Sequence, residues 1–139
     1  MFLRYVIEDI KEDEGFRGMP YKDSLGKETI GYGTLLPLNK KESIILLKYR
    51  LEKNVKEFDV LYRKNRSKGK PFSILGCRYE SIIMNMVYQL GAKGVIGFDN
   101  MLEAMENDSK EDVKKHMRDS KWYKQTPNRV ENLIKKYLC

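Results

Sequence analysis

Hydrophobic and polar residues follow a helical period over most of this 139-residue chain. Near the start, Leu3, Val6, Ile7 and Ile10 recur at helical spacing and predict a short amphipathic helix over residues 2–12, which Gly15 ends. A longer apolar stripe predicts a helix over residues 41–62 whose opposite face is charged. Its members are Ile44, Leu47, Leu51, Val55, Phe58 and Tyr62.

The second half of the chain also predicts helices. The segment SIIMNMVYQL (81–90) is apolar on nearly every side, which is typical of a buried helix. Shorter helices are predicted near residues 98–105, after the capping pattern of Ser109 and Asp112, and from Thr126–Pro127, where threonine is a good N-cap and proline a good first residue.

Residues 13–36 carry no helical period. Their glycines and Pro20 disfavour a helix, whereas the β-formers on either side of a Gly-containing turn predict a small hairpin. These β-formers are Tyr21, Thr29, Ile30 and Tyr32. The pattern therefore predicts an α+β protein that is mostly helical, with one small early β region.

Composition indicates one folded domain with 41% hydrophobic residues. No apolar run reaches the ~20 residues that span a bilayer, and Arg4, Glu8 and Asp9 interrupt the N-terminal segment, so we expect neither membrane insertion nor a signal peptide. Cys77 and Cys139 form no metal-binding spacing and are expected to be reduced thiols. We expect no metal and no cofactor.

The formal net charge is +7, from 27 Lys plus Arg against 20 Asp plus Glu. This balance favours an anionic partner, whether nucleic acid, a membrane face or an acidic envelope polymer. The basic run RKNRSKGKP (63–71) is typical of a solvated loop. A nucleic-acid binder is disfavoured because Glu52, Glu57 and Asp59 are mixed among the lysines of the long helix.

Three polar residues of the early region are candidates for chemistry. Glu14 ends the first predicted helix, where the partial negative charge of the helix end favours a protonated carboxyl. Asp23 lies in a polar turn in which it should stay ionised, and Thr29 opens the returning strand, where its hydroxyl could hold a water near Asp23. One neutral and one ionised carboxyl are what glycoside hydrolysis requires. Taken singly, these residues also fit a helix surface and a turn former.

Spacing distinguishes these readings. The pattern Glu14-x8-Asp23-x5-Thr29, within DEG, YKD and TIGYGT, resembles the catalytic pattern of the phage-type lysozymes (endolysins) of glycoside hydrolase family 24. Two further blocks follow in the order that the family has them, NMVYQLGAKGVIGF (85–98) and WYKQTPNRV (122–130). Together the blocks cover most of the chain.

The resemblance implies a single two-lobed lysozyme-like domain over residues 1–139. Its small β-hairpin lobe would cover about 13–40, the inter-lobe helix about 41–62, and the helical lobe 1–12 plus 71–139. The short link from Pro37 to Ser43 implies a trimmed β lobe with fewer sugar contacts. Thr34 and His116 depart from the best-known member of the family, and we assign no catalysis to His116.

The resemblance also implies an activity: hydrolysis of the β-1,4 bond between N-acetylmuramic acid and N-acetylglucosamine in peptidoglycan, with inversion. Glu14 would protonate the leaving oxygen, and Asp23 with Thr29 would activate a water. Arg129 would pair with Glu14 and support it. Substrate-binding positions would be Leu35, Tyr88 and Gln89, whereas Trp122 is expected in the core.

The partners expected on this basis are peptidoglycan glycan strands, bound by a monomer without nucleic acid. We expect the protein to stay in the host cytoplasm until the membrane is permeabilised and then to act on the wall. Two alternatives stay open: a catalytically inactive lysozyme-fold module that binds peptidoglycan or another polyanion, and a lytic transglycosylase, in which a hydroxyl of the sugar itself attacks and no water site is needed.

Overall fold

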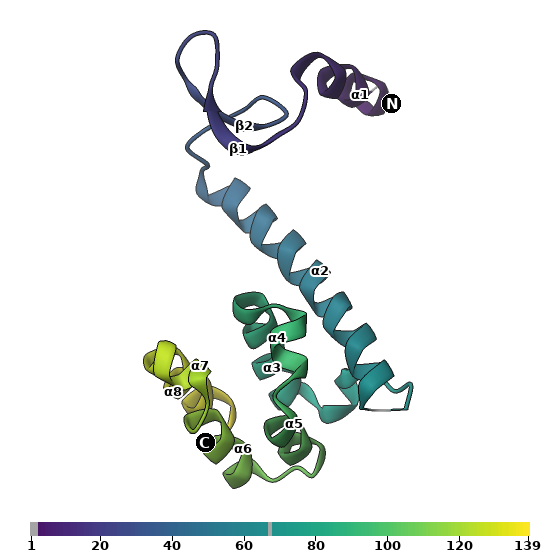
Figure 1. Cartoon of the computed structure of the whole chain (residues 1–139), viewed down its shortest axis with the longest axis vertical. Coiled ribbons are helices and arrows are strands. Elements are labelled where there is room, and N and C mark those ends of the chain that lie inside the picture. The colour runs from purple at the N-terminus through teal and green to yellow at the C-terminus, as the bar shows by residue number, and fades with distance from the viewer. Residues whose placement is uncertain (1–2, 67) are drawn as a thin grey trace. The chain divides into compact units, whose positions relative to one another are not determined.

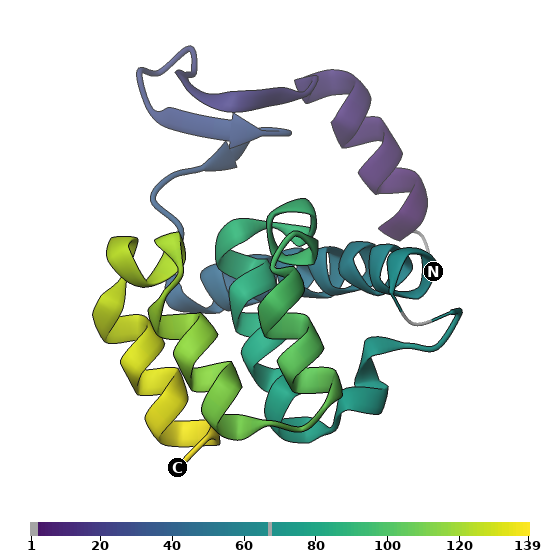
Figure 2. The same cartoon turned by 60° about the horizontal axis from the view of Figure 1, so that its bottom comes forward.

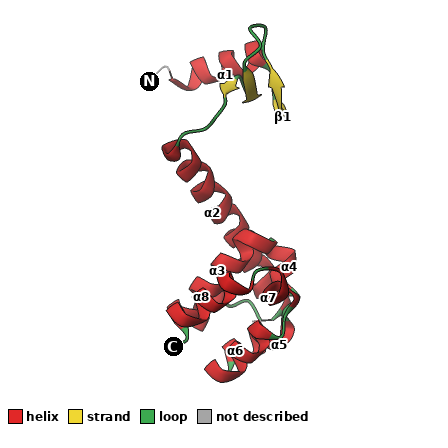
Figure 3. Cartoon of the chain, turned by 90° about the vertical axis from the view of Figure 1, so that its left-hand side faces the viewer, coloured by secondary structure: helices red, strands yellow, loops and turns green. Residues whose placement is uncertain are grey.

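The computed structural model describes residues 3–66 and 68–139, which form two compact units. Unit 1 extends to Leu46 and unit 2 covers Leu47–Cys139, so the division falls within the long helix α2, Lys40–Asn65 (Figure 1). The strands all lie in unit 1, between the first helix and α2 (Figure 3). The predicted α+β, mostly helical, lysozyme-like fold class is confirmed, whereas the lobe assignment of residues 1–12 stays a prediction.

Unit 1 contains one helix and a small antiparallel sheet. Helix α1 (Leu3–Glu14) is followed by β1 (Arg17–Lys22), β2 (Glu28–Gly31) and β3 (Thr34–Leu35), in the sheet order β1-β2-β3. The predicted hairpin is present as β1–β2, with Tyr21 opposite Thr29. The third strand was not predicted. It forms because Gly31 and Gly33, with φ of 68° and 76°, let the chain reverse within two residues.

Helix α1 ends where its sequence allows the turn. The Gly15 amide donates to the carbonyl of Lys11 at 3.0 Å, and Gly15 has a φ of 67°, a conformation that glycine adopts without strain. The helix therefore continues past residue 12, its predicted end, and includes Glu14 as its last residue. None of its described residues is buried.

Unit 2 is helical (Figure 2). Beyond the greater part of α2 it contains, in chain order, the 3₁₀ helix η1 (Phe72–Leu75), α3 (Cys77–Leu90), α4 (Ala92–Ile96), α5 (Asp99–Glu106), α6 (Lys110–Arg118), α7 (Lys121–Gln125) and α8 (Pro127–Tyr137). The helices expected from periodicity are present, and α4 and α7 are additional. Helix α3 contributes five buried side chains to the core, Tyr79, Ile82, Ile83, Met86 and Val87, as its apolar sequence predicts.

Two predicted helix starts use their polar groups differently from the expected caps. The Ser109 hydroxyl donates to the Asp112 carboxylate at 2.9 Å and does not accept from a backbone amide of α6. Thr126 stands at the N-cap of α8, with Pro127 next, but its hydroxyl donates to the Trp122 carbonyl at 3.3 Å. Both helices begin where predicted, while these hydroxyls make other contacts.

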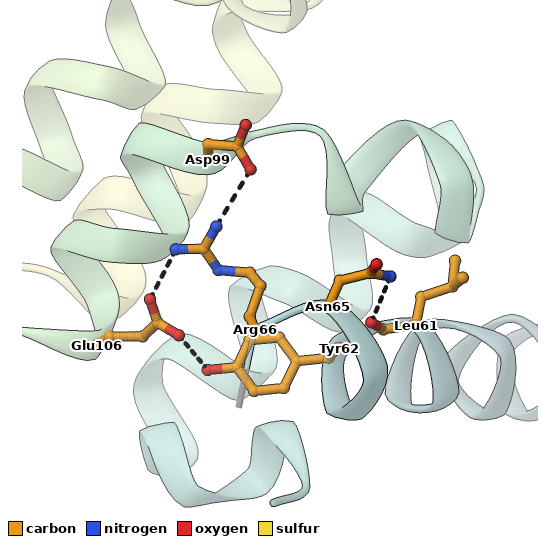
Figure 4. Close-up of polar contacts among 6 residues, drawn as sticks. All are labelled: Leu61, Tyr62, Asn65, Arg66, Asp99 and Glu106. Atoms are coloured by element: carbon orange, nitrogen blue, oxygen red, sulfur yellow. Dashed lines mark hydrogen bonds and ion pairs between the residues drawn. The ribbon is translucent and has the colours of Figure 1, made fainter. Parts of the chain in front are cut away.

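The basic segment 63–71 is not a wholly solvated loop, because α2 continues through Asn65 and Arg66 is ion-paired. The Arg66 guanidinium donates to Asp99 at 3.1 Å and to Glu106 at 2.8 Å, and the Tyr62 hydroxyl donates to the same Glu106 at 2.8 Å (Figure 4). Burial, and then the bond to Glu106, raise the pKa of Tyr62 well above its usual range. This network fixes the end of α2 on α5.

Two structural features are absent from the described part of the chain. Within residues 3–66 and 68–139, no helix has both the length and the apolar character needed to cross a bilayer. The same residues contain no cluster of histidine, cysteine or carboxylate side chains that could hold a metal ion. Cys77 and Cys139 are exposed free thiols.

Candidate active site

Glu14 lies against the turn that joins β2 to β3. A Cβ placed on Gly33 would lie 2.7 Å from both Cδ and Oε2 of Glu14, so the carboxyl occupies the space that any side chain at Gly33 would need. The φ of Gly33 is 76°, which also disfavours a side chain there. The carboxyl of Glu14 therefore packs directly against the backbone of this turn at Gly33.

Asp23 organises the turn between β1 and β2. Its Oδ1 accepts from the amides of Leu25 and Lys27, both at 2.9 Å, and the Gly26 amide donates to the Asp23 carbonyl at 3.0 Å. This arrangement is an Asx-type turn, which aspartate favours because its short side chain reaches amides two and four residues ahead. The other carboxylate oxygen, Oδ2, bonds to no described residue.

Thr29 is connected to Asp23 through the backbone of Lys27. The Thr29 hydroxyl donates to the Lys27 carbonyl at 3.0 Å, and that carbonyl also accepts the amide of Asp23 at 2.9 Å. Thr29 is 2% exposed, and it is the one buried polar residue among those described. Asp23 and Thr29 are thus held in a fixed relation by a single peptide unit.

Leu35 lies on β3, opposite Thr29 in the antiparallel register. It is 53% exposed and lines a shallow hollow of about 440 Å³ on unit 1. The other lining residues are Lys27, Glu28, Leu36 and Pro37. An exposed leucine beside Lys27 is compatible with the predicted contact to a sugar ring, and that role stays a prediction.

Arg129 and Tyr88 share a hollow of unit 2. Arg129, near the start of α8, donates from Nε to Asn85 Oδ1 at 2.9 Å, which fixes its guanidinium over α3. Tyr88 lies one helical turn after Asn85 and is 39% exposed. Both line a hollow of about 390 Å³, together with Leu47, Leu51, Ser81, Met84 and Tyr137. The expected pairing of Arg129 with Glu14 stays a prediction.

Gln89 uses both ends of its amide within unit 2. Its Oε1 accepts from the indole Nε1 of Trp122 at 2.8 Å, and its Nε2 donates to the Thr126 hydroxyl at 3.2 Å. The ring of Trp122 is buried, 2% exposed, so its predicted place in the core is confirmed. An amide held in this way has one N–H and one lone pair left for a ligand, and its role toward a sugar stays a prediction.

His116, the single histidine of the chain, is half-buried on α6. It lines a hollow of about 520 Å³ with Asp99, Asn100, Asp119, Ser120 and Lys121. The described residues around it contain no cluster that could hold a metal. Phe98 and Met101 also line this hollow, so His116 belongs to a surface hollow of mixed polarity on unit 2.

The predicted site residues divide between the two units. Glu14, Asp23, Thr29 and Leu35 lie in unit 1, around a single three-stranded sheet; Tyr88, Gln89 and Arg129 lie in unit 2. Three further residues contact these side chains and have no role in the sequence-based prediction: Gly33, Lys27 and Asn85. Two sequence features could have identified them: Gly33 lies within the TIGYGT motif, and Asn85 lies one helical turn before Tyr88.

The chain has a lysozyme-like fold that is mostly helical with one small sheet. Around that sheet lie the Glu14 carboxyl at the end of α1, the Asp23 carboxyl in the β1–β2 turn and the buried Thr29 hydroxyl. No protein-family model matches the chain. Comparison with curated proteins gives 29% identity over 150 residues with probable T4-type lysozyme 1 of Dictyostelium discoideum, covering 90% of this chain and 88% of that protein.

Two phage proteins are also similar. The chain is 29% identical over 152 residues to the pre-baseplate central spike protein of Enterobacteria phage T4, covering 92% of this chain and 26% of that protein. It is 28% identical over 141 residues to a peptidoglycan hydrolase of Pseudomonas phage phiKMV, covering 93% of this chain and 14% of that protein. The resemblance to phage-type lysozymes is therefore confirmed along nearly the whole chain.

Proposed function

We propose that this protein is a muramidase that cleaves the β-1,4 bond between N-acetylmuramic acid and N-acetylglucosamine in peptidoglycan, with inversion at the anomeric carbon. Its relatives support the substrate class, because their names include T4-type lysozymes and a peptidoglycan hydrolase. The bond and the stereochemistry are our inference from the residues. Inversion needs an acid on one side of the sugar and a water held by a base on the other.

The turn Asp23–Lys27 carries this proposal. Because Oδ1 of Asp23 accepts two backbone amides, the ionised carboxylate is oriented while Oδ2 keeps its lone pairs for a water. The Thr29 hydroxyl donates its proton to the Lys27 carbonyl, so its remaining capacity is as an acceptor. A water that donates to both groups would have its oxygen lone pair directed away from them, toward the sugar.

Glu14 supplies the proton in this scheme. Its side chain is exposed and makes no hydrogen bond or ion pair with another described residue of unit 1, so the carboxyl can approach a glycosidic oxygen. Its contact with Gly33 restricts where it can point. General acid catalysis of this kind contributes about 10²–10⁴ in rate.

The test is release of reducing ends from purified peptidoglycan. Glu14→Gln should lower kcat by about a hundredfold or more, because the amide cannot donate a proton in the required way. Asp13→Asn is the matched control, since Asp13 is the neighbouring exposed acid of α1, and it should keep wild-type activity. Equal activity of wild type and Glu14→Gln would exclude Glu14 as the acid.

The products distinguish the alternatives. An inverted anomer, observed by NMR immediately after cleavage, is expected, whereas 1,6-anhydro-muramic acid ends would indicate a lytic transglycosylase. Binding to peptidoglycan without cleavage by the wild type would indicate the inactive lysozyme-fold module. We further infer that the protein acts as a monomer and reaches the wall after the membrane is permeabilised; lysis assays with and without a permeabilising agent test the latter.

Asp23 has two roles that substitution can separate. Asp23→Asn keeps Oδ1 as an acceptor for the Leu25 and Lys27 amides but removes the charge, so the fold should persist while activity is lost. Asp23→Ala removes both and should also lower the melting temperature. Thr29→Ser, which keeps the hydroxyl, should retain more activity than Thr29→Ala. Full activity in Asp23→Asn would show that the charge is not needed to activate water.

A further inference from the structure

An aromatic contact connects the β2–β3 turn to the end of α1. The ring of Tyr32, in this turn, lies 5.4 Å from the ring of Phe16 (centroid to centroid), and the two planes are tilted by 55°. On α1, the Lys11 ammonium lies 5.6 Å from the centroid of the same Tyr32 ring. Tilted aromatic pairs and cation–π contacts at such distances are both attractive.

These contacts lie on both sides of the proposed acid. Lys11 precedes Glu14 by one helical turn and Phe16 follows it by two residues, while Tyr32 contacts both. The residue after Tyr32 is Gly33, whose backbone meets the Glu14 carboxyl. The β2–β3 turn therefore contacts the helix end that carries the acid, and it also limits the space that the carboxyl can occupy.

The contact between Tyr32 and Phe16 is not part of a buried hydrophobic core. Tyr32 is 41% exposed and Phe16 is 66% exposed, and neither belongs to a hydrophobic core cluster. A contact at such an exposed position is expected to fix local geometry more than global stability. An exposed aromatic ring near the acid could instead stack on a sugar, and that role would affect substrate binding.

We propose that Tyr32 is a positioning residue for the acid Glu14, acting through Phe16 and Lys11 and through the adjacent Gly33. The proposal rests on the proposed function, in which Glu14 donates the proton. A misplacement of a catalytic group by about 1 Å can cost about a hundredfold in rate. Loss of the ring should therefore lower the rate of the chemical step and leave substrate affinity nearly unchanged.

The kinetic test compares Tyr32→Ala with Tyr32→Phe on a soluble peptidoglycan oligosaccharide. Tyr32→Ala should lower kcat about tenfold to a hundredfold with KM within about twofold of wild type. Tyr32→Phe keeps the ring and should restore kcat. Tyr5→Ala is the control, because Tyr5 is an exposed tyrosine of α1 that contacts Arg4, and it should leave kcat unchanged. An unchanged kcat in Tyr32→Ala, or a raised KM alone, would overturn the proposal.

A second measurement does not depend on activity. The carboxyl carbon signal of Glu14, observed by NMR in protein labelled at glutamate, should shift in Tyr32→Ala and in Phe16→Leu but stay at its wild-type position in Tyr32→Phe. Gly33→Ala provides the positive control for a displaced carboxyl. If Tyr32→Ala does not fold, Phe16→Leu decides the matter, and an unmoved signal there rejects positioning. A wild-type protein without hydrolytic activity would reject the proposed function while this signal still tests the contact.

Discussion

Unit 1 and unit 2 differ in what their side chains bury. The described hydrophobic residues that are buried, from Phe58 to Leu138, all belong to unit 2, whereas Thr29 is the one buried residue described in unit 1. Yet unit 1 carries Glu14, Asp23 and Thr29. The proposed chemistry therefore lies on a unit whose geometry depends on turn hydrogen bonds, glycine conformations and an exposed aromatic contact.

The two units also differ in charge. Residues 1–46 contain 7 Lys plus Arg against 8 Asp plus Glu, a net charge of −1, and residues 47–139 contain 20 against 12, a net charge of +8. The whole positive excess is thus in unit 2. A charged surface raises the local concentration of an oppositely charged polymer. Unit 2 is therefore the part of the chain expected to attract an anionic polymer.

The comparison predicts that the same substitution has unequal effects in the two units. Phe58 is 0% exposed and its ring lies 5.2 Å from that of Phe72, so Phe58→Ala should lower the free energy of unfolding by about 3–5 kcal/mol. Phe16 is 66% exposed, so Phe16→Ala should cost only about 0.5–1.5 kcal/mol.

Urea unfolding measures both losses. Trp122, the single tryptophan, is buried in unit 2, so its fluorescence follows that unit, while far-UV circular dichroism follows the whole chain. Similar losses in Phe58→Ala and Phe16→Ala would show that unit 1 depends on burial as much as unit 2 does. That result would contradict the inference that burial stabilises unit 2 while turn hydrogen bonds and exposed contacts hold unit 1.

A smaller effect is expected at the two buried tyrosines of unit 2 that donate to carboxylates. Burial, with the bond to Asp108 at 2.7 Å, raises the pKa of Tyr79 from 10 to about 12, and the pKa of Tyr62 is raised for the same kind of reason. Because the pKa of Tyr79 is higher in the folded state, its contribution to the stability of that state is complete at pH values below the unfolded pKa of 10. The stabilisation is lost as pH rises from 10 through about 12.

Tyr79→Phe should therefore cost about 1–3 kcal/mol at pH 8, because a hydrogen bond to a charged group is lost. It should also weaken the fall of stability between pH 10 and 12, as measured by urea unfolding with Trp122 fluorescence. Tyr49→Phe is the control, since Tyr49 is 65% exposed on the same unit. A wild-type stability that is flat through pH 12 would contradict the assignment.

The regular elements could be predicted from sequence where a long period exists. The α2 stripe from Ile44 to Tyr62 identified a helix of many turns, and the apolar sequence of α3 identified its burial. Helix α4 was missed because its five residues, AKGVI, are too short to show a period and include Gly94. Strand β3 was missed because two residues pair only once the Gly31–Gly33 turn has formed.

The candidate site could be predicted only where side-chain chemistry shows in the sequence. Glu14, Asp23 and Thr29 were identified by residue type and by the spacing of a family motif. Gly33 and Lys27 act through their backbones, one by leaving space and one by bonding through its peptide groups, so no side-chain pattern marks them. The division of α2 between two units is likewise a property of contacts, which the helical period does not reveal.

The smallest effect is expected at the exposed pair Arg118–Glu131, whose closest contact is 2.7 Å. Its hydrogen bond holds the pKa of Glu131 below its usual range, so any stabilisation is present above the unfolded pKa and lost as pH falls below about 4.5. Both side chains are exposed, so water and salt screen the attraction.

Like-charge repulsion in unit 2 should then decide which substitution costs more. Glu131→Gln raises the net charge of unit 2 and Arg118→Gln lowers it, so Glu131→Gln should have the lower urea midpoint at low salt. About 1 M NaCl should remove the difference, because it shortens the screening length to about 3 Å. A lower midpoint for Arg118→Gln at low salt would show that the positive excess of unit 2 does not affect its stability.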